Sequence, residues 1–136
     1  MEKIQIDSGM KAYRINGGGV LRFNPADPNV YVRFLEAVEQ VKTLEAGLQG
    51  EDPLSACKQA DRQLKQLLGQ VFGEHNDFDQ LLGGVSLLAV AGNGQTVMSN
   101  LLSALLPILE EGAQSYAGEL TARAVEKAQR RRANGQ

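Results

Sequence analysis

The chain has 136 residues, of which 43% are apolar and 22% are charged, and its formal net charge is −2. This size and composition are typical of one soluble globular domain, residues 1–136, and exclude a disordered or fibrous chain. The single cysteine excludes an internal disulfide and favours a reducing, cytoplasmic location. The start is charged, and every apolar stretch is much shorter than the about 20 residues that span a bilayer. We therefore expect no secretory signal and no membrane-spanning segment.

Residues 1–24 predict a β-hairpin region. Polar and apolar side chains alternate in residues 3–7, 12–15 and 20–23, as in half-buried strands. The last two segments are joined by Asn16-Gly17-Gly18-Gly19, whose residue types readily adopt the positive φ angles of tight hairpin turns. A glycine-rich phosphate loop is the alternative, but such a loop leads from a strand into a helix. Because this one leads into another strand-like segment, we expect a hairpin.

The segment 27–72 predicts a helical hairpin. Asp27-Pro28 and Asp52-Pro53 each place an N-cap acceptor before a proline, which is a typical helix start. Apolar residues then recur at steps of three and four, to about residue 46 in the first helix and about residue 72 in the second. Gly47 and Gly50 end the first helix. Two amphipathic helices joined by a short turn are expected to pack antiparallel.

The segment 76–111 predicts a short helix at 78–82, an apolar loop and a strongly apolar helix that starts after Gly94. We expect Pro107 to bend or end that helix, because proline removes one backbone donor and crowds the carbonyl of Ser103. Residues 112–136 then form a separate basic helix and tail. The expected fold class is α+β, mostly α: an N-terminal β-hairpin followed by a bundle of about four to five helices.

Few residues suggest catalysis or metal binding. The single histidine, His75, lies among acidic residues, but it has no second histidine or cysteine at a metal-ligand spacing, so a polar loop is favoured over a metal site. Cys57 lies on an apolar helix face, where a buried, inert thiol is favoured over a nucleophile. The Gly92-Asn93-Gly94 turn lacks the further residues of a nucleotide-binding loop. We therefore expect a protein that is not an enzyme and that uses no cofactor or metal.

The strongly apolar helix predicts a surface for a partner. We expect Leu101, Leu105 and Ile108 to lie in the core. The helix carries more leucines than one face requires, and surplus apolar helix surface commonly marks a binding face. The candidate partner-binding residues are Leu102, Leu106 and Leu109. The same surplus also makes self-association plausible.

The C-terminal residues are basic, with a net charge of +3 in 119–136 against −5 in 1–118. Contact with phosphate or with a protein partner is one interpretation of Arg130, Arg131 and Arg132. The alternative is that basic residues at the end of a last helix complement its dipole and keep it soluble. This alternative is favoured, because no aromatic residue or second basic stripe accompanies the tail.

The order of motifs resembles a known family. The strand pair ends in Val20-Leu21-Arg22-Phe23-Asn24-Pro25-Ala26-Asp27-Pro28-Asn29, and an acidic amphipathic helix follows it. Val71-Phe72-Gly73-Glu74 and a helix with Leu105-Leu106-Pro107 come later. Over about residues 12–110 this pattern is similar to that of the small tail assembly chaperones of long-tailed bacteriophages and prophages of Gram-positive hosts.

The resemblance implies a non-structural protein of the infected host cell's cytoplasm. Such a chaperone binds and solubilises the long helical tape measure protein and helps recruit tail tube subunits around it. The alternative function is a small regulatory or nucleic-acid-binding adaptor that uses the basic tail. The residues disfavour nucleic acid as a partner.

Overall fold

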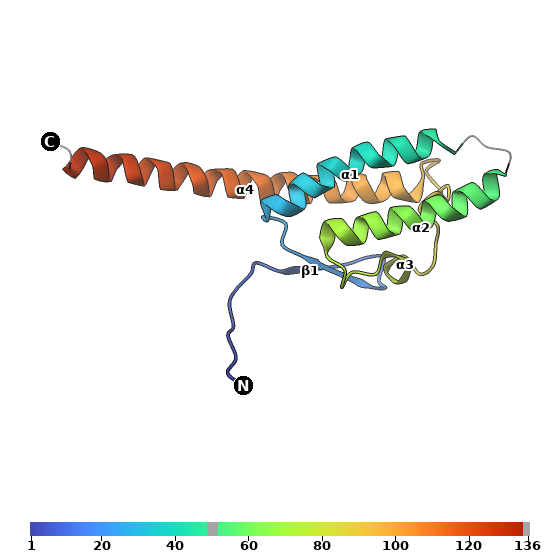
Figure 1. Ribbon diagram of the computed structural model, residues 1–136, viewed down its shortest axis with the longest axis horizontal. Helices are drawn as coiled ribbons and strands as arrows, with labels where there is room; N and C mark the ends of the chain where they lie inside the picture. The colour runs from blue at the N-terminus through green and yellow to red at the C-terminus, as the bar shows by residue number, and fades with distance from the viewer. Residues whose placement is uncertain (49–51, 135–136) are drawn as a thin grey trace.

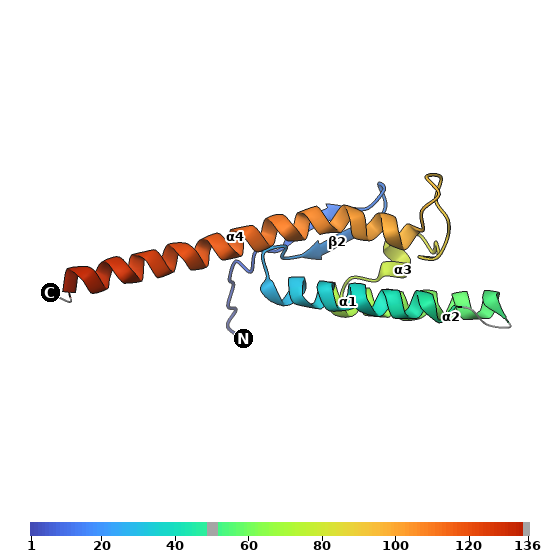
Figure 2. The same cartoon turned by 90° about the horizontal axis from the view of Figure 1, so that it is seen from above.

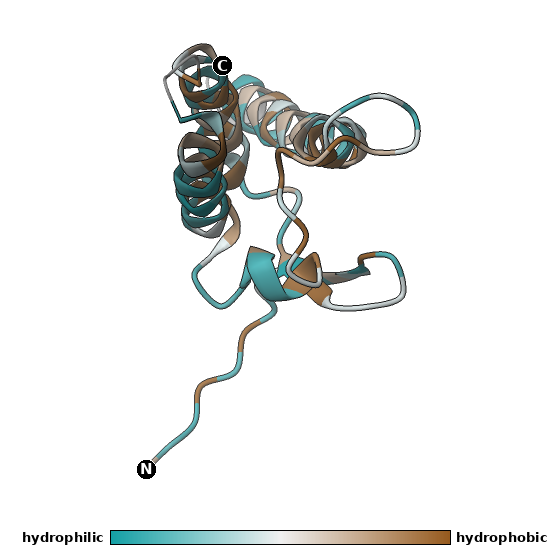
Figure 3. Cartoon of the chain, turned by 90° about the vertical axis from the view of Figure 1, so that its right-hand side faces the viewer, coloured by the Kyte–Doolittle hydropathy of each residue, from teal (hydrophilic) through white to brown (hydrophobic). Residues whose placement is uncertain are grey.

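The computed structural model describes residues 1–48 and 52–134 of the chain. An N-terminal antiparallel two-stranded sheet is followed by four helices, so the expected class, α+β and mostly α, is confirmed (Figure 1). The elements are β1 (Lys11–Arg14), β2 (Val20–Phe23), α1 (Pro28–Ala46), α2 (Pro53–Phe72), α3 (Phe78–Leu81) and α4 (Val97–Asn134). Viewed along the helices, α1 and α2 lie on one side, α4 lies on the other, and the sheet lies below (Figure 3).

The two strands form the expected hairpin. Tyr13 pairs with Leu21, and the Ile15 amide donates to the Gly19 carbonyl at 2.9 Å, which closes the turn. Asn16 and Gly17 have φ angles of +52° and +75°, the left-handed conformation that this turn requires. The expectation of a further strand at residues 3–7 is wrong: these residues form no ladder and are fully exposed. Alternation alone does not make a strand, because a strand also needs a neighbour for its backbone groups.

Helices α1 and α2 begin where the sequence predicts. The Asp27 carboxylate accepts from the Asn29 amide, and the Asp52 carboxylate accepts from the Ser55 amide. Gly47 caps the end of α1. Gly50 lies outside the described residues. The two helices pack side by side as the expected hairpin (Figure 1).

One apolar core joins all these elements. The sheet contributes Leu21 and Phe23, and the ring of Phe23 packs edge-on against that of Phe72 at the end of α2, with 4.8 Å between centroids. The other fully buried members come from every helix and from the loop before α4: Phe34, Leu64, Leu68, Val71, Phe78, Leu87, Met98 and Leu109.

A buried asparagine joins the sheet to the helices. The Asn76 side chain accepts from the Arg22 amide at 2.9 Å and donates to the Arg22 carbonyl at 2.8 Å. It also donates to the Phe72 carbonyl at 3.0 Å. Asn76 therefore pairs with the outer edge of β2 as a neighbouring strand would, and it holds that edge against the end of α2.

Helix α4 is one continuous helix of 38 residues. The expectation that Pro107 ends or separates it, with a distinct last helix from about residue 113, is wrong. Both Ser103, whose carbonyl loses its donor, and Pro107 are exposed, so water can satisfy the free carbonyl. Leu105 and Leu109 are buried on either side of Pro107, and the core therefore holds both flanking turns in one line. Among the described residues, no helix has the length and apolar character needed to cross a membrane.

Candidate partner-binding helix

Helix α4 leaves the body of the protein at Gly112. A Cβ atom built on Gly112 would lie 1.8 Å from the Pro25 carbonyl oxygen, so only glycine allows this approach. The next residue, Ala113, lines an apolar cleft of about 180 Å³ with Tyr116, one turn later, and with Pro25, Pro28 and Tyr31. Residues 114–132 are exposed, and this half of α4 extends away from the other elements (Figures 1 and 2). We call residues 113–134 the projecting half of α4.

The three candidate leucines differ in their exposure to solvent. Leu106 is 37% exposed, and Leu102 is partly buried against the core. Leu109 is completely buried, so its assignment to a partner surface is wrong: it faces the body at the last packed turn, where the chain itself covers it. Of the three residues expected in the core, Leu105 is buried, whereas Leu101 and Ile108 are partly buried at its margin.

A stripe of apolar residues continues along the projecting half. Its members repeat every 11 residues, at steps of four, three and four. This pattern has about 3.67 residues per turn, so the members stay on one side of a nearly straight helix. We call it the α4 stripe: Leu102, Leu106, Leu109, Ala113, Ala117, Leu120, Ala124 and Ala128. The stripe starts against the core and becomes free beyond Ala113, and Leu120 is 47% exposed.

The stripe members beyond Ala113 were not predicted as a surface, because the sequence interpretation divided the helix at Pro107. The 11-residue spacing is the signal that identifies them, since it relates Leu102 to Ala113 and Ala124, and Leu109 to Leu120. Arg131 occupies the next equivalent position and ends the apolar run.

Local interactions support the projecting half. Glu119 pairs with Arg123 at 3.0 Å, and Glu126 pairs with Arg130 at 2.5 Å, both in the favourable i,i+4 order with the acidic residue first. Most helical stability in proteins nevertheless comes from packing an apolar face, and residues 117–132 of this half are exposed. A second helix laid on the α4 stripe would supply that packing.

The three terminal arginines lie in the last turns of α4. Arg130 is held by Glu126, and Arg131 and Arg132 are exposed on the final turn. Their charges complement the helix dipole. The structure therefore places them at the far end of the projecting half, beyond the apolar members of the stripe.

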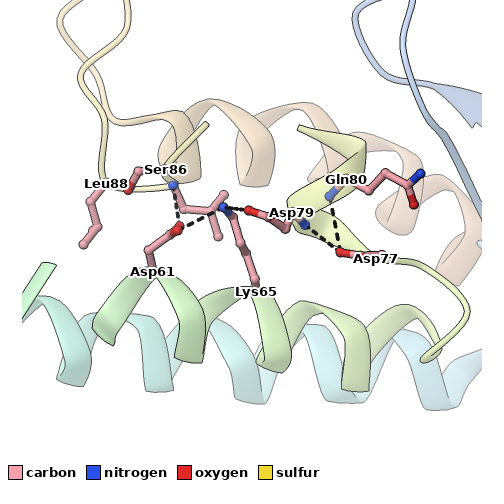
Figure 4. A network of polar contacts seen from close by, with 8 residues as sticks. Asp61, Lys65, Asp77, Asp79, Gln80, Ser86 and Leu88 are labelled. Atoms are coloured by element: carbon pink, nitrogen blue, oxygen red, sulfur yellow. Dashed lines mark hydrogen bonds and ion pairs between the residues drawn. The ribbon is translucent and has the colours of Figure 1, made fainter. Parts of the chain in front are cut away.

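A lysine between two carboxylates fixes the other end of α4. Lys65 has a side chain only 9% exposed, and its ammonium group lies 2.9 Å from Asp61 and 2.6 Å from Asp79 (Figure 4). Burial lowers the pKa of Lys65, but the hydrogen bonds and negative charges of Asp79 and Asp61 outweigh this effect and raise the pKa above its ordinary value.

The same network continues into the start of α4. Asp61 accepts from the Leu87 amide at 2.8 Å, and the Leu87 carbonyl accepts from the Met98 amide at 2.8 Å. Lys65 thus orients Asp61, Asp61 holds the loop, and the loop holds the first turn of α4. The packed half of α4 is anchored at this end by the network and at the other end by Gly112.

The polar residues singled out in the sequence have structural contacts. The His75 ring lies 3.0 Å from the Arg22 carbonyl, beside Asn76. Cys57 is partly buried rather than fully buried. Gly94, at φ +81°, forms a tight turn closed by the Ala91 amide and the Gln95 carbonyl. No group of three or more potential metal ligands occurs within residues 1–48 and 52–134.

Comparison of the chain with protein-family models, with curated proteins and with solved structures gave no match in any of the three searches.

Proposed function

We propose that this protein is a tail assembly chaperone that binds the tape measure protein of a long-tailed phage through the exposed members of the α4 stripe. The observation that carries the proposal is the projecting half of α4, which beyond Tyr116 presents exposed apolar side chains along a straight stripe and extends away from the other described elements. The resemblance of residues 12–110 to this family supplies the identity of the partner. Binding itself requires no catalytic group.

The stripe fits a long helical partner. Its members in the projecting half are mostly alanines, which allow a second helix to approach closely, and Leu120 supplies one large side chain in their midst. A partner helix with an apolar seam would bury this surface by helix-to-helix packing, and many copies could cover successive segments of one long partner. Covering those segments would keep the partner soluble until tail tube subunits replace the chaperone.

Co-expression tests the proposal. A segment of a tape measure protein with an apolar helical seam is expressed alone, with this chain, or with a variant that carries Leu106→Asp and Leu120→Asp. We expect the segment to be soluble only with the unaltered chain. The matched control is Val125→Asp, because Val125 is 51% exposed on the same helix but lies outside the stripe. Equal aggregation of the segment with and without the unaltered chain would contradict the proposal.

The adaptor alternative predicts a different result. If the arginines at the end of α4 bind phosphates, the chain is retained on DNA in a salt-dependent way, and deletion of residues 129–136 abolishes the retention. Retention of this kind, together with no effect on the tape measure segment, would favour the adaptor.

A further inference from the structure

The two edges of the β-hairpin differ. In an antiparallel pair, alternate residues direct their backbone groups toward the partner strand and away from it. The hydrogen bond between Ile15 and Gly19 sets this alternation, so Tyr13 faces β2, whereas Ala12 and Arg14 direct their amide and carbonyl groups outward. On β2 the outward groups belong to Val20 and Arg22, and Asn76 occupies both groups of Arg22. The outer edge of β2 is therefore occupied at Arg22, in the middle of the strand.

The outer edge of β1 borders an apolar groove. This groove, of about 490 Å³, lies between β1 and α4 and is lined by Tyr13, Ile15, Leu101 and Ile108, among other residues. These four side chains are only partly buried, although each packs against the core. A strand edge beside an apolar groove is the arrangement that binds an extended segment, since the backbone pairs with the edge and alternate side chains enter the groove.

The same chain carries a segment of matching chemistry. Residues 3–7 alternate as Lys-Ile-Gln-Ile-Asp, and Ile4 and Ile6 are 91% and 80% exposed. Such a pattern has two apolar side chains on one face of a strand. The polar face of the segment carries Lys3, Gln5 and Asp7, and β1 carries Arg14 on its own polar face.

The segment is held away from its own β1. The Ser8 carbonyl accepts from the Asn24 side chain at 2.9 Å, and Gly9, at φ +74°, packs directly on that side chain. From this contact residues 1–7 extend away from the sheet (Figure 1). To reach its own β1 edge the chain would have to reverse at residues 8–10 and lose the bond to Asn24. The edge of a second copy requires no such change.

We propose that two copies of the chain exchange their N-terminal segments, so that residues 3–7 of each copy add as an antiparallel strand to the open edge of β1 of the other. One register satisfies both the backbone and the side chains. Gln5 lies opposite Arg14 and Asp7 opposite Ala12, which pairs the outward backbone groups. Ile6 then lies opposite Tyr13 and Ile4 opposite Ile15, so both isoleucines enter the groove. The pairing is reciprocal, as a two-fold dimer requires.

This interface is independent of the α4 stripe, and its first test is the oligomeric state. Sedimentation equilibrium of the full chain is expected to show a dimer, twice 14.7 kDa. Ile4→Asp with Ile6→Asp should raise the dimer dissociation constant by about ten-thousandfold, roughly a hundredfold for each of the two exchanged segments. Circular dichroism should remain unchanged, because both side chains are exposed in the single chain. The conservative control, Ile4→Val with Ile6→Val, should remain dimeric.

Cross-linking tests the register. In a Cys57→Ser background, Gln5→Cys with Arg14→Cys places two cysteines opposite each other, at the Cα separation of about 5.5 Å that a disulfide accepts. We expect a disulfide between chains, and none from the control pair Gln5→Cys with Lys11→Cys, which is out of register. A chain that is monomeric at every concentration, a dimer unaffected by the aspartate substitutions, or a disulfide within one chain would each overturn the proposal.

Discussion

Gly112 of α4 lies directly against the carbonyl group of Pro25, at the point where the helix leaves the body. A Cβ atom at this position would lie 1.8 Å from the carbonyl oxygen and 2.4 Å from the carbonyl carbon. Because both atoms belong to the backbone, the contact cannot be relieved by rotation of a side chain. The contact therefore fixes where the packed half of α4 ends and the projecting half begins.

The first prediction compares two glycines of α4. Gly112→Ala should lower the free energy of unfolding by about 2 kcal/mol, because α4 or the Pro25 turn must shift to accept the methyl group. Gly118→Ala is the matched control, since nothing lies within 4 Å of a Cβ atom there. Alanine at 118 should raise the helix content of the projecting half, since glycine costs a helix about 1 kcal/mol. Urea unfolding followed by circular dichroism measures both effects. Equal stability of the two variants would contradict the close contact at Gly112.

The second prediction concerns Asn76, whose side chain pairs with the outer edge of β2 at Arg22. Asn76→Ala removes three hydrogen bonds and leaves the backbone groups of Arg22 without their partner. We expect a loss of about 2 kcal/mol or more in the free energy of unfolding. Asn93→Ala is the control, because Asn93 is exposed and its side chain bonds only within the turn and to Asn100. Equal stability of both variants would show that Asn76 does not hold the sheet.

The third prediction is a pH dependence. The pKa of Lys65 is raised in the folded protein above its ordinary value of 10.5, so folding is favoured by the protonated lysine. This contribution is fully present below the pKa of the unfolded chain and is lost as the pH rises through the higher folded pKa. Lys65→Met should lower the free energy of unfolding by about 1–3 kcal/mol near neutral pH, because Asp61 and Asp79 lose their charged partner.

The stability difference between the unaltered protein and Lys65→Met isolates this effect. Effects of alkaline pH on the rest of the chain are common to both proteins and cancel in the difference. We expect the difference to be constant from neutral pH to about pH 10 and to shrink above it. A difference that stays constant through the alkaline range would contradict the role of the Lys65 ammonium group.

Local features of the sequence predicted most of the fold. Asp27-Pro28 and Asp52-Pro53 mark the starts of α1 and α2 because a cap and its helix are adjacent in the chain. The Asn16–Gly19 turn is equally local. Features that depend on distant residues were not predicted. Asn76 bonds to Arg22, 54 residues away, and no periodicity encodes such a pair.

The errors about α4 and residues 3–7 have the same physical origin. Pro107 favours a break, but Leu105 and Leu109 hold the turns on both sides of it in the core, so tertiary packing overrides the local preference. Residues 3–7 have the alternation of a strand, yet the bond between the Asn24 side chain and the Ser8 carbonyl holds them away from the outer edge of β1. For the candidate surface, the sequence named three leucines, of which Leu106 is exposed, Leu102 is partly buried and Leu109 is covered by the body, and it omitted the projecting half.

The central claim is that the α4 stripe binds a helical partner, and its most direct test is an affinity measurement. The dissociation constant of a fluorescently labelled tape measure segment is measured by anisotropy for the unaltered chain, for Leu120→Asp and for Val125→Asp. We expect Leu120→Asp to weaken binding by about tenfold or more, because the partner buries this side chain, and Val125→Asp to bind normally. Equal affinity of all three proteins, or a greater loss for Val125→Asp than for Leu120→Asp, would contradict the account.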